Sequence, residues 1–138
     1  MTLLDAYALI AFLVGGPAQA HVRRILRDGD AAVATVNLAE SLDVSARLHG
    51  LPIARAMEIL EPLFEGPVAA IPLDIQAARR AAALRAAHYH RSLRPISMAD
   101  AVLIASAQGS DRIATADKDI LAIAEAEKLE VIALPEQG

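Results

Sequence analysis

Short apolar segments alternate with helical segments along the whole chain, and this alternation is the feature that most restricts its fold. Five segments are predicted to be strands, at residues 2–4, 31–35, 68–71, 112–114 and 130–133. Parallel strands need helical crossovers between them, and strands buried on both faces are short and almost wholly apolar. The pattern therefore predicts an α/β fold in which helices cover both faces of a central parallel sheet.

Helix signals fill the intervals between these strands. Helices are expected at residues 6–14, 17–27, 37–48, 52–62, 74–88, 97–108 and 117–128. Several begin at a residue that caps helices well, such as Asn37 or Asp74, and several end near a glycine, as at Gly15 and Gly109. Because no repeat, low-complexity tract or long linker divides the chain, residues 1–138 are predicted to form a single domain.

Composition excludes several classes of protein. The chain has no cysteine, so it has neither disulfides nor a thiolate metal site or nucleophile. Its longest apolar run, residues 6–14, is far shorter than the about 20 residues that span a membrane. No basic segment precedes this run as in a signal peptide, so we expect a soluble cytoplasmic protein with no membrane contact. The formal net charge of −4 does not by itself indicate nucleic-acid binding.

One carboxylate interrupts the most apolar of the helical segments, SMADAVLIASAQ at residues 97–108. Ser97 is a good N-cap and Asp100 follows it by three residues, so the two side chains could form a capping box. A negative charge is also favourable near the positive end of a helix. The local sequence therefore allows a purely structural role for Asp100 and leaves a functional role open.

Three further acids stand near predicted strand ends. Asp5 directly follows the first strand, Glu40 lies in the first turn after the second, and Asp117 follows the fourth. Asp5 and Asp117 could simply be N-caps, and Glu40 could complete a capping box with Asn37. In open α/β sheets, however, the ligand site lies beyond the carboxyl ends of the strands. We therefore expect one pocket at this edge that contains all four acids, Asp5, Glu40, Asp100 and Asp117.

Four carboxylates in one pocket repel one another and need a positive partner. Two such charges about 4 Å apart cost about 4 kcal/mol at an effective dielectric constant near 20. Carboxylate oxygens and water are the ligands that Mg²⁺ or Mn²⁺ prefers. An ion of this kind can bind a phosphodiester, activate a water molecule and stabilise an in-line displacement. The acidic set thus indicates metal-dependent phosphoryl chemistry.

Other chemical motifs are missing or incomplete. No glycine-rich nucleotide-binding stretch follows a strand, and no G-x-S-x-G sequence occurs. A phosphatase or phosphoacceptor domain could use Asp5 as its nucleophile, but Tyr7 stands where such a domain needs a second acid. This alternative is therefore weaker than a metal site built from four acids.

Four segments together resemble the acidic motifs of PIN domains: LLDAYALIAFL at 3–13, NLAE at 37–40, SMADAVLIASA at 97–107 and IATADKDI at 113–120. Their order and spacing and the chain length are most similar to VapC-type toxins of bacterial toxin–antitoxin pairs. The residues that match the acidic site by position are Asp5, Glu40, Asp100 and Asp117. The resemblance implies that Asp5 and Asp100 bind the metal directly, and that Glu40 and Asp117 bind it directly or through water. Thr115 matches a hydroxyl residue two positions before the last acid, and Asp119 matches an additional nearby acid.

The resemblance also implies the architecture, activity and partners of the protein. These are a three-layer α/β/α sandwich, Mg²⁺- or Mn²⁺-dependent endoribonuclease activity, a homodimer, and a small antitoxin that neutralises the toxin and binds DNA. Ala6 and Tyr7 depart from the small polar residues common at these positions, and Arg94-Pro95 departs from the small residues that usually precede the third motif. These departures bear on rate and substrate preference rather than on the acidic set. A second interpretation is a PIN-like scaffold that binds metal weakly and acts through antitoxin pairing.

A basic segment contrasts with the acidic set. No acid occurs between Asp74 and Asp100, whereas five arginines do: Arg79, Arg80, Arg85, Arg91 and Arg94. Such a run is usually a solvated helix face, but it can also contact phosphates. Because an RNA substrate and the acidic pocket are both anionic, we predict that three of these residues bind RNA phosphates: Arg85, Arg91 and Arg94.

Overall fold

The protein, described here by a computed structural model over residues 1–136, contains a five-stranded sheet with strand order β3-β2-β1-β4-β5. The strands are β1 (Thr2–Leu4), β2 (Ala31–Ala34), β3 (Val68–Ile71), β4 (Arg112–Thr115) and β5 (Glu130–Ala133). All neighbouring strands are parallel, and each lies within one residue of its predicted bounds. The first strand is thus the central one, with β2 and β4 on its two sides.

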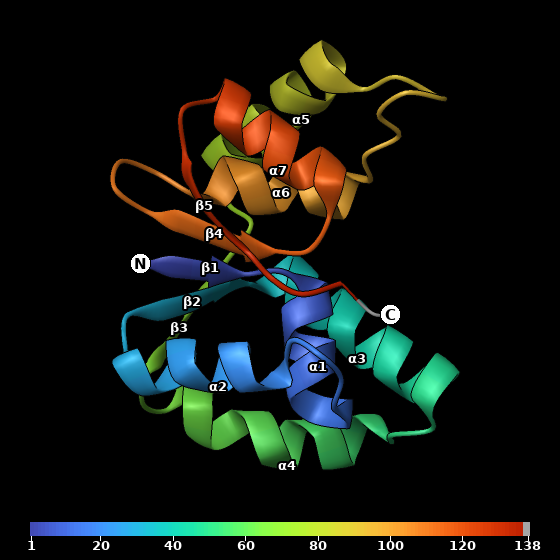
Figure 1. The fold of residues 1–138 in the computed structure, drawn as a ribbon, viewed down its shortest axis with the longest axis vertical. Helices are drawn as coiled ribbons and strands as arrows, with labels where there is room; N and C mark the ends of the chain where they lie inside the picture. Colours follow the sequence, from blue (N-terminus) through green and yellow to red (C-terminus); the bar gives the residue numbers. More distant parts are fainter. Residues whose placement is uncertain (137–138) are drawn as a thin grey trace.

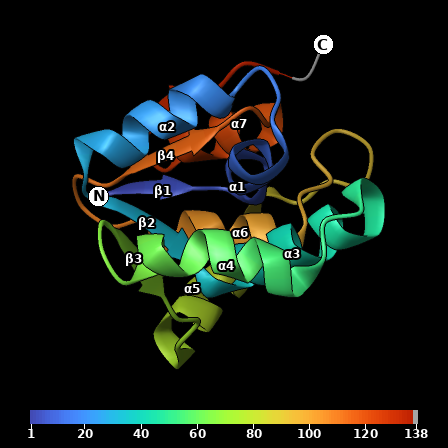
Figure 2. The same ribbon diagram turned by 90° about the horizontal axis from the view of Figure 1, so that it is seen from below.

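Within the described residues, seven helices connect and cover these strands. They are α1 (Ala6–Val14), α2 (Gln19–Asp28), α3 (Thr35–His49), α4 (Ile53–Phe64), α5 (Ile75–His88), α6 (Met98–Ser106) and α7 (Lys118–Ala126). In Figure 1, α5, α6 and α7 lie on one side of the sheet, and α1, α2 and α4 lie on the other. Figure 2, seen from below, shows α2 and α4 in front of the strands. The predicted three-layer α/β/α sandwich is confirmed.

Alternating strand residues divide the core into two layers. Leu3 and Ile113 are buried against α6 and α7, whereas their chain neighbours Leu4 and Ala114 are buried against α1 and α2. This alternation is that of strands covered on both faces. Helix α6 is buried from Ala101 to Ser106, which explains its nearly apolar sequence.

The predicted start of α3 is wrong. This helix begins at Thr35, directly after β2, and Ala34 occupies its N-cap position without a capping side chain. Asn37 is buried inside the first turn, where its amide donates to the carbonyl of Ala99 at 3.4 Å. Glu40 therefore lies in the second turn and forms no capping box with Asn37. A tertiary contact to α6 overrides the local preference of asparagine for a cap position.

Other helix ends differ by smaller amounts. Helix α4 continues through Pro62 to Phe64, because a proline in the last turn removes only one intrahelical hydrogen bond. Helix α6 ends at Ser106, two residues before the predicted Gln108, and α2 begins two residues after Pro17. Between residues 1 and 136, no helix has the length and apolarity needed to cross a bilayer.

Candidate active site

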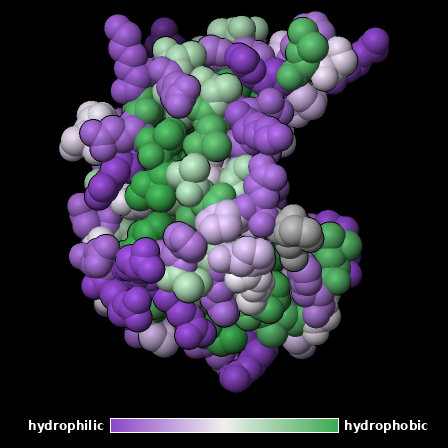
Figure 3. All heavy atoms as spheres, in the orientation of Figure 1, coloured by the Kyte–Doolittle hydropathy of each residue, from purple (hydrophilic) through white to green (hydrophobic). Residues whose placement is uncertain are grey.

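All four predicted acids line one pocket of about 380 Å³ at the carboxyl ends of the strands. Asp5 lies between β1 and α1, and Asp117 between β4 and α7, whereas Glu40 and Asp100 lie on α3 and α6. The remaining lining residues are Ala6, Tyr7, Ile10, Val44, Ser97 and Ile120. Figure 3 shows the surface hollowed on this side, to the right in this view, between α3 and the loop that follows α5. The four acids thus meet at the carboxyl edge of the sheet, as expected from their positions after the strands.

Asp5 is the most buried of the four acids, with 4% of its surface exposed. It caps α1 by accepting a hydrogen bond from the backbone N–H of Ala8 at 2.8 Å, and it accepts another from the Thr115 hydroxyl at 2.5 Å. Burial raises the pKa of Asp5 to about 6, although both hydrogen bonds oppose this rise. The charges of Asp100 and Asp117 raise it further. A carboxylate buried in this way favours the binding of a cation or of a proton.

Thr115 joins the two acids that follow β1 and β4. The buried Thr115 hydroxyl donates to Asp5 and accepts from the backbone N–H of Asp117 at 3.0 Å. Asp117 in turn caps α7, accepting from the N–H groups of Asp119 and Ile120 at 2.8 and 3.0 Å. Asp119 does not line the pocket, but its charge contributes to the raised pKa of Asp100. Thr115 therefore links Asp5 to Asp117, at the position where the resemblance predicts a hydroxyl residue.

Asp100 is both a capping residue of α6 and a residue of the acidic pocket. Ser97 and Asp100 form the predicted capping box, in which Ser97 Oγ accepts from the N–H of Asp100 at 3.1 Å and the Asp100 carboxylate accepts from the N–H of Ser97 at 3.3 Å. The same carboxylate lines the acidic pocket. Burial raises the pKa of both Asp100 and Glu40, and the charge of Asp100 adds to the rise at Glu40.

The donor set fits a hard divalent cation. The described lining residues include four carboxylates and no lysine, arginine or histidine to balance them. In the part of the chain from residue 1 to 136, no three acidic or histidine side chains already stand close enough to hold one ion. Mg²⁺ commonly binds through only one or two carboxylates and keeps several waters. The pocket therefore offers carboxylates for such an ion, with water to complete its coordination.

Tyr7 also lines the pocket, although the acidic motifs do not predict this. It is half-buried, and its hydroxyl donates to the carbonyl of Pro135 at 2.6 Å. Ile10, three residues along α1, lines the same pocket. The signal was the helical spacing of Tyr7 and Ile10 directly after Asp5, which places both side chains beside that acid.

The three arginines predicted to bind RNA lie outside the acidic pocket. Arg85 is already engaged, because its Nε donates to the carbonyl of Ile96 at 3.0 Å and its guanidinium lies 4.4 Å from the centre of the Tyr89 ring. Arg91 is exposed and Arg94 is half-buried, in the loop between α5 and α6. The contact of these arginines with RNA stays a prediction.

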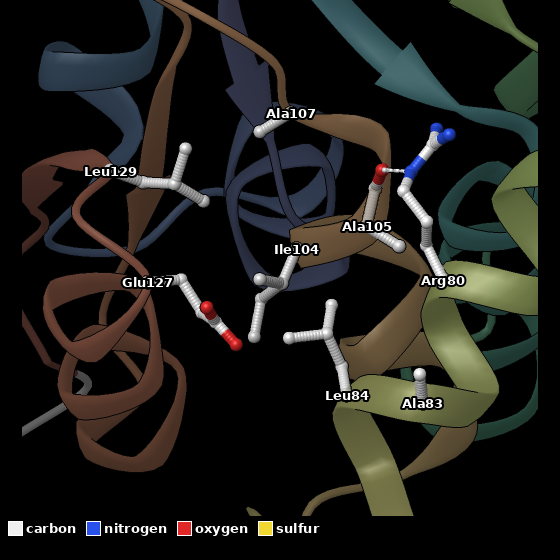
Figure 4. A pocket seen from close by; sticks show the side chains of 8 residues that line it. All are labelled: Arg80, Ala83, Leu84, Ile104, Ala105, Ala107, Glu127 and Leu129. Carbon is white, nitrogen blue, oxygen red and sulfur yellow. Dashed lines mark hydrogen bonds between the residues drawn. The ribbon is translucent and has the colours of Figure 1, made fainter. Parts of the chain in front are cut away.

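A second hollow, of about 350 Å³, lies between α5, α6 and the segment from α7 to β5 (Figure 4). Leu84, Ile104 and Leu129 point into it, and Arg80 and Glu127 stand on opposite sides. Arg80 Nε donates to the carbonyl of Ala105 at 3.1 Å, which holds α5 against α6. This hollow is largely apolar and includes none of the four acids, so it is separate from the acidic pocket.

Comparison with known proteins agrees with this geometry. Residues 2–126 match the family model of the PIN domain, whereas no curated protein sequence matches the chain. The structure is similar to FitAcB from Neisseria gonorrhoeae, with 27% sequence identity over 96% of both chains and a TM-score of 0.67. It is also similar to a toxin–antitoxin complex from Klebsiella pneumoniae, with 19% identity over 99% of both chains and a TM-score of 0.69. VapBC2 from Rickettsia felis, bound to a fragment of promoter DNA, is 12% identical over 97% of this chain and 98% of that chain, with a TM-score of 0.66.

The matched range contains all four acids of the pocket and the threonine that joins two of them. The resemblance expected from the four acidic motifs is therefore confirmed, and the chain belongs to the PIN domain family.

Proposed function

We propose that this protein is the toxin of a toxin–antitoxin pair and acts as a metal-dependent endoribonuclease of the VapC type. The observation that carries the proposal is the meeting of Asp5, Glu40, Asp100 and Asp117 in one pocket without a compensating cation among its described lining residues. PIN domain toxins are generally nucleases, and PIN domains typically use divalent metal ions. The predicted cytoplasmic location belongs to this proposal.

In the proposed site, Asp5 and Asp100 hold Mg²⁺ or Mn²⁺ directly, and Glu40 and Asp117 do so directly or through water. The bound ion supplies a Lewis acid that lowers the pKa of a water molecule and stabilises the charge of an in-line displacement. Thr115 holds Asp5 beside the start of α7 through its two hydrogen bonds. Asp119 adds negative charge beside Asp100, which strengthens cation binding.

The proposed partners are RNA, a cognate antitoxin and a second copy of the chain. The similar structures support the antitoxin, because the one from Klebsiella pneumoniae is a toxin–antitoxin complex by name and all three share this fold. Co-expression with the product of a neighbouring small gene for a DNA-binding protein tests this pairing. Light scattering of the purified chain tests the homodimer.

The central experiment is cleavage of end-labelled RNAs of defined sequence by purified protein with Mn²⁺, Mg²⁺ or a chelator. We expect cleavage with either metal, none with the chelator, and none by the Asp100→Asn variant. Asp74→Asn is a matched control, because Asp74 also lies at a helix start but outside the acidic pocket. A wild-type protein that binds its antitoxin and cuts no RNA in either metal refutes the nuclease and favours the alternative binding module.

A further inference from the structure

The aromatic residue Tyr7 stands at the junction of two hollows. It lines the acidic pocket, and it also lines a neighbouring hollow of about 240 Å³ with Ala116, Asp117 and Glu136. The whole chain has only two tyrosines, two phenylalanines and no tryptophan. Tyr7 is the single aromatic side chain among the described residues that line these two hollows.

The Tyr7 ring is held at both ends. Its backbone belongs to the first turns of α1, directly after the buried Asp5, and its hydroxyl donates to the carbonyl of Pro135. The segment that carries Pro135 is itself anchored, because the N–H of the buried Leu134 donates to the carbonyl of Thr115 at 2.8 Å. A half-buried ring fixed in this way loses little conformational entropy when a planar ligand stacks on it.

The acidic pocket has an apolar part beside its carboxylates. Ala6, Tyr7 and Ile10 of α1 line the pocket together with Val44 of α3. A phosphate is repelled by the acids unless a metal ion intervenes, whereas a nucleobase is uncharged and offers an apolar face. The two parts of the pocket therefore match the two parts of a nucleotide.

We propose that Tyr7 is the stacking platform for one unpaired base of the RNA, next to the phosphate at the acidic site. The proposal rests on the proposed ribonuclease function and names the residue of this chain that would hold one base beside the cut. Bases in a duplex are stacked on one another and cannot lie on the ring, whereas unpaired bases stack on aromatic side chains. Tyr7 is in this sense a positioning residue that orients the strand without taking part in the reaction.

Kinetics of two substitutions test the proposal. Tyr7→Leu removes the ring, and we expect the KM for single-stranded RNA to rise by about 5- to 150-fold, the range that corresponds to losing one base–aromatic stack. Tyr7→Phe keeps the ring and loses only the hydrogen bond to Pro135, so its KM should stay within about threefold of the wild-type value. Phe12→Leu is the matched control, because Phe12 also belongs to α1 but packs on the core away from the pocket.

Nuclear magnetic resonance gives a second readout that does not need cleavage. With only two tyrosines in the chain, the Tyr89→Phe variant assigns the ring signals of Tyr7. The probe is a single-stranded RNA octamer of mixed sequence, added with Mg²⁺ to protein that also carries Asp100→Asn. We expect the ring protons of Tyr7 to shift upfield with this octamer and to stay in place with a fully abasic octamer.

Two outcomes overturn the stacking role. One is a Tyr7→Phe variant as impaired as Tyr7→Leu, which makes the tie to Pro135 the important feature. The other is a Tyr7 ring signal that does not move, or moves equally with the abasic octamer. Both differ from failure of the proposed function, which is a wild-type protein that cuts no RNA with either metal.

Discussion

The aspartates at the starts of α1 and α5 make the same local contact in different surroundings. Asp5 and Asp74 each cap a helix by accepting from the backbone N–H three residues later, at 2.8 Å in both cases. Asp5 is buried at the end of the central strand, whereas Asp74 is exposed and follows the edge strand β3 after two intervening residues. Helix capping therefore does not distinguish an acid of the pocket from one outside it, whereas the position of the preceding strand in the sheet does.

The sharpest test of this comparison replaces each aspartate by asparagine, which also caps helices well. We expect Asp5→Asn to slow RNA cleavage by about 100-fold or more, because the substitution removes a charged ligand of the metal ion. Such an ion stabilises the transition state by several kcal/mol. Asp74→Asn should cut at the wild-type rate. Initial rates with Mn²⁺ measure both. Equal losses in the two variants would show that the place of Asp5 in the acidic pocket does not explain its effect on cleavage.

The second prediction concerns the pH dependence of stability in the metal-free protein. Burial raises the pKa of Asp5 to about 6, whereas its pKa in an unfolded chain is about 3.9. Between these values the folded protein holds a proton that the unfolded chain has released, so the free energy of unfolding falls as the pH rises through this window. Asp5 should therefore contribute about 3 kcal/mol more stability at pH 3.5 than at pH 7.

Urea unfolding between pH 3.5 and 7 in the presence of a chelator measures this contribution of Asp5 to the free energy of unfolding. The contribution of Asp5 is the difference in pH dependence between the wild-type protein and Asp5→Asn, since other carboxylates titrate in both proteins. We expect the variant to be the more stable protein at pH 7 and to lose this advantage on acidification. A pH profile that is identical in the two proteins would mean that Asp5 is ionised without cost in the folded state.

A third, smaller effect separates capping from function at α6. Ser97→Ala removes half of the capping box while the Asp100 carboxylate stays, so we expect a loss of about 1 kcal/mol in unfolding free energy. Asp100→Asn should cost no more stability than this, yet it should abolish cleavage. Thermal unfolding and cleavage assays on the two variants measure the two effects. Near wild-type cleavage by Asp100→Asn with a lowered Tm would assign Asp100 to the cap alone.

The smallest expected effects are those of the arginines. Arg91→Gln and Arg94→Gln should each flatten the salt dependence of single-stranded RNA binding by about 0.7 in log–log slope, if each residue contacts one phosphate. Arg85→Gln should also lower stability by about 1 kcal/mol, because the hydrogen bond to Ile96 is lost. Binding titrations across salt concentrations, in the Asp100→Asn background, provide the slopes. Unchanged slopes would leave these arginines with structural roles only.

Strand positions and the set of pocket acids could be predicted because both depend on local sequence. Short apolar runs mark β1 to β5, and the acids within two residues of the ends of β1 and β4 reach the pocket with little freedom to lie elsewhere. The start of α3 could not be predicted, since burial of Asn37 against Ala99 depends on a contact 62 residues away. The contact of Tyr7 with Pro135, 128 residues away, has no local signal for the same reason. That residues 1–138 form a single domain stays a prediction.

The hydrogen bond between Thr115 and Asp5 spans 110 residues of the chain, and it has a consequence for synthesis on the ribosome. Asp5 emerges from the ribosome 110 residues before its partner threonine in β4. At about 5 to 20 residues per second, this interval lasts about 5 to 20 seconds. During that time the nascent chain has the acid that starts the pocket and lacks Asp100 and Asp117. A site that cuts RNA would thus be absent until translation has passed Asp117.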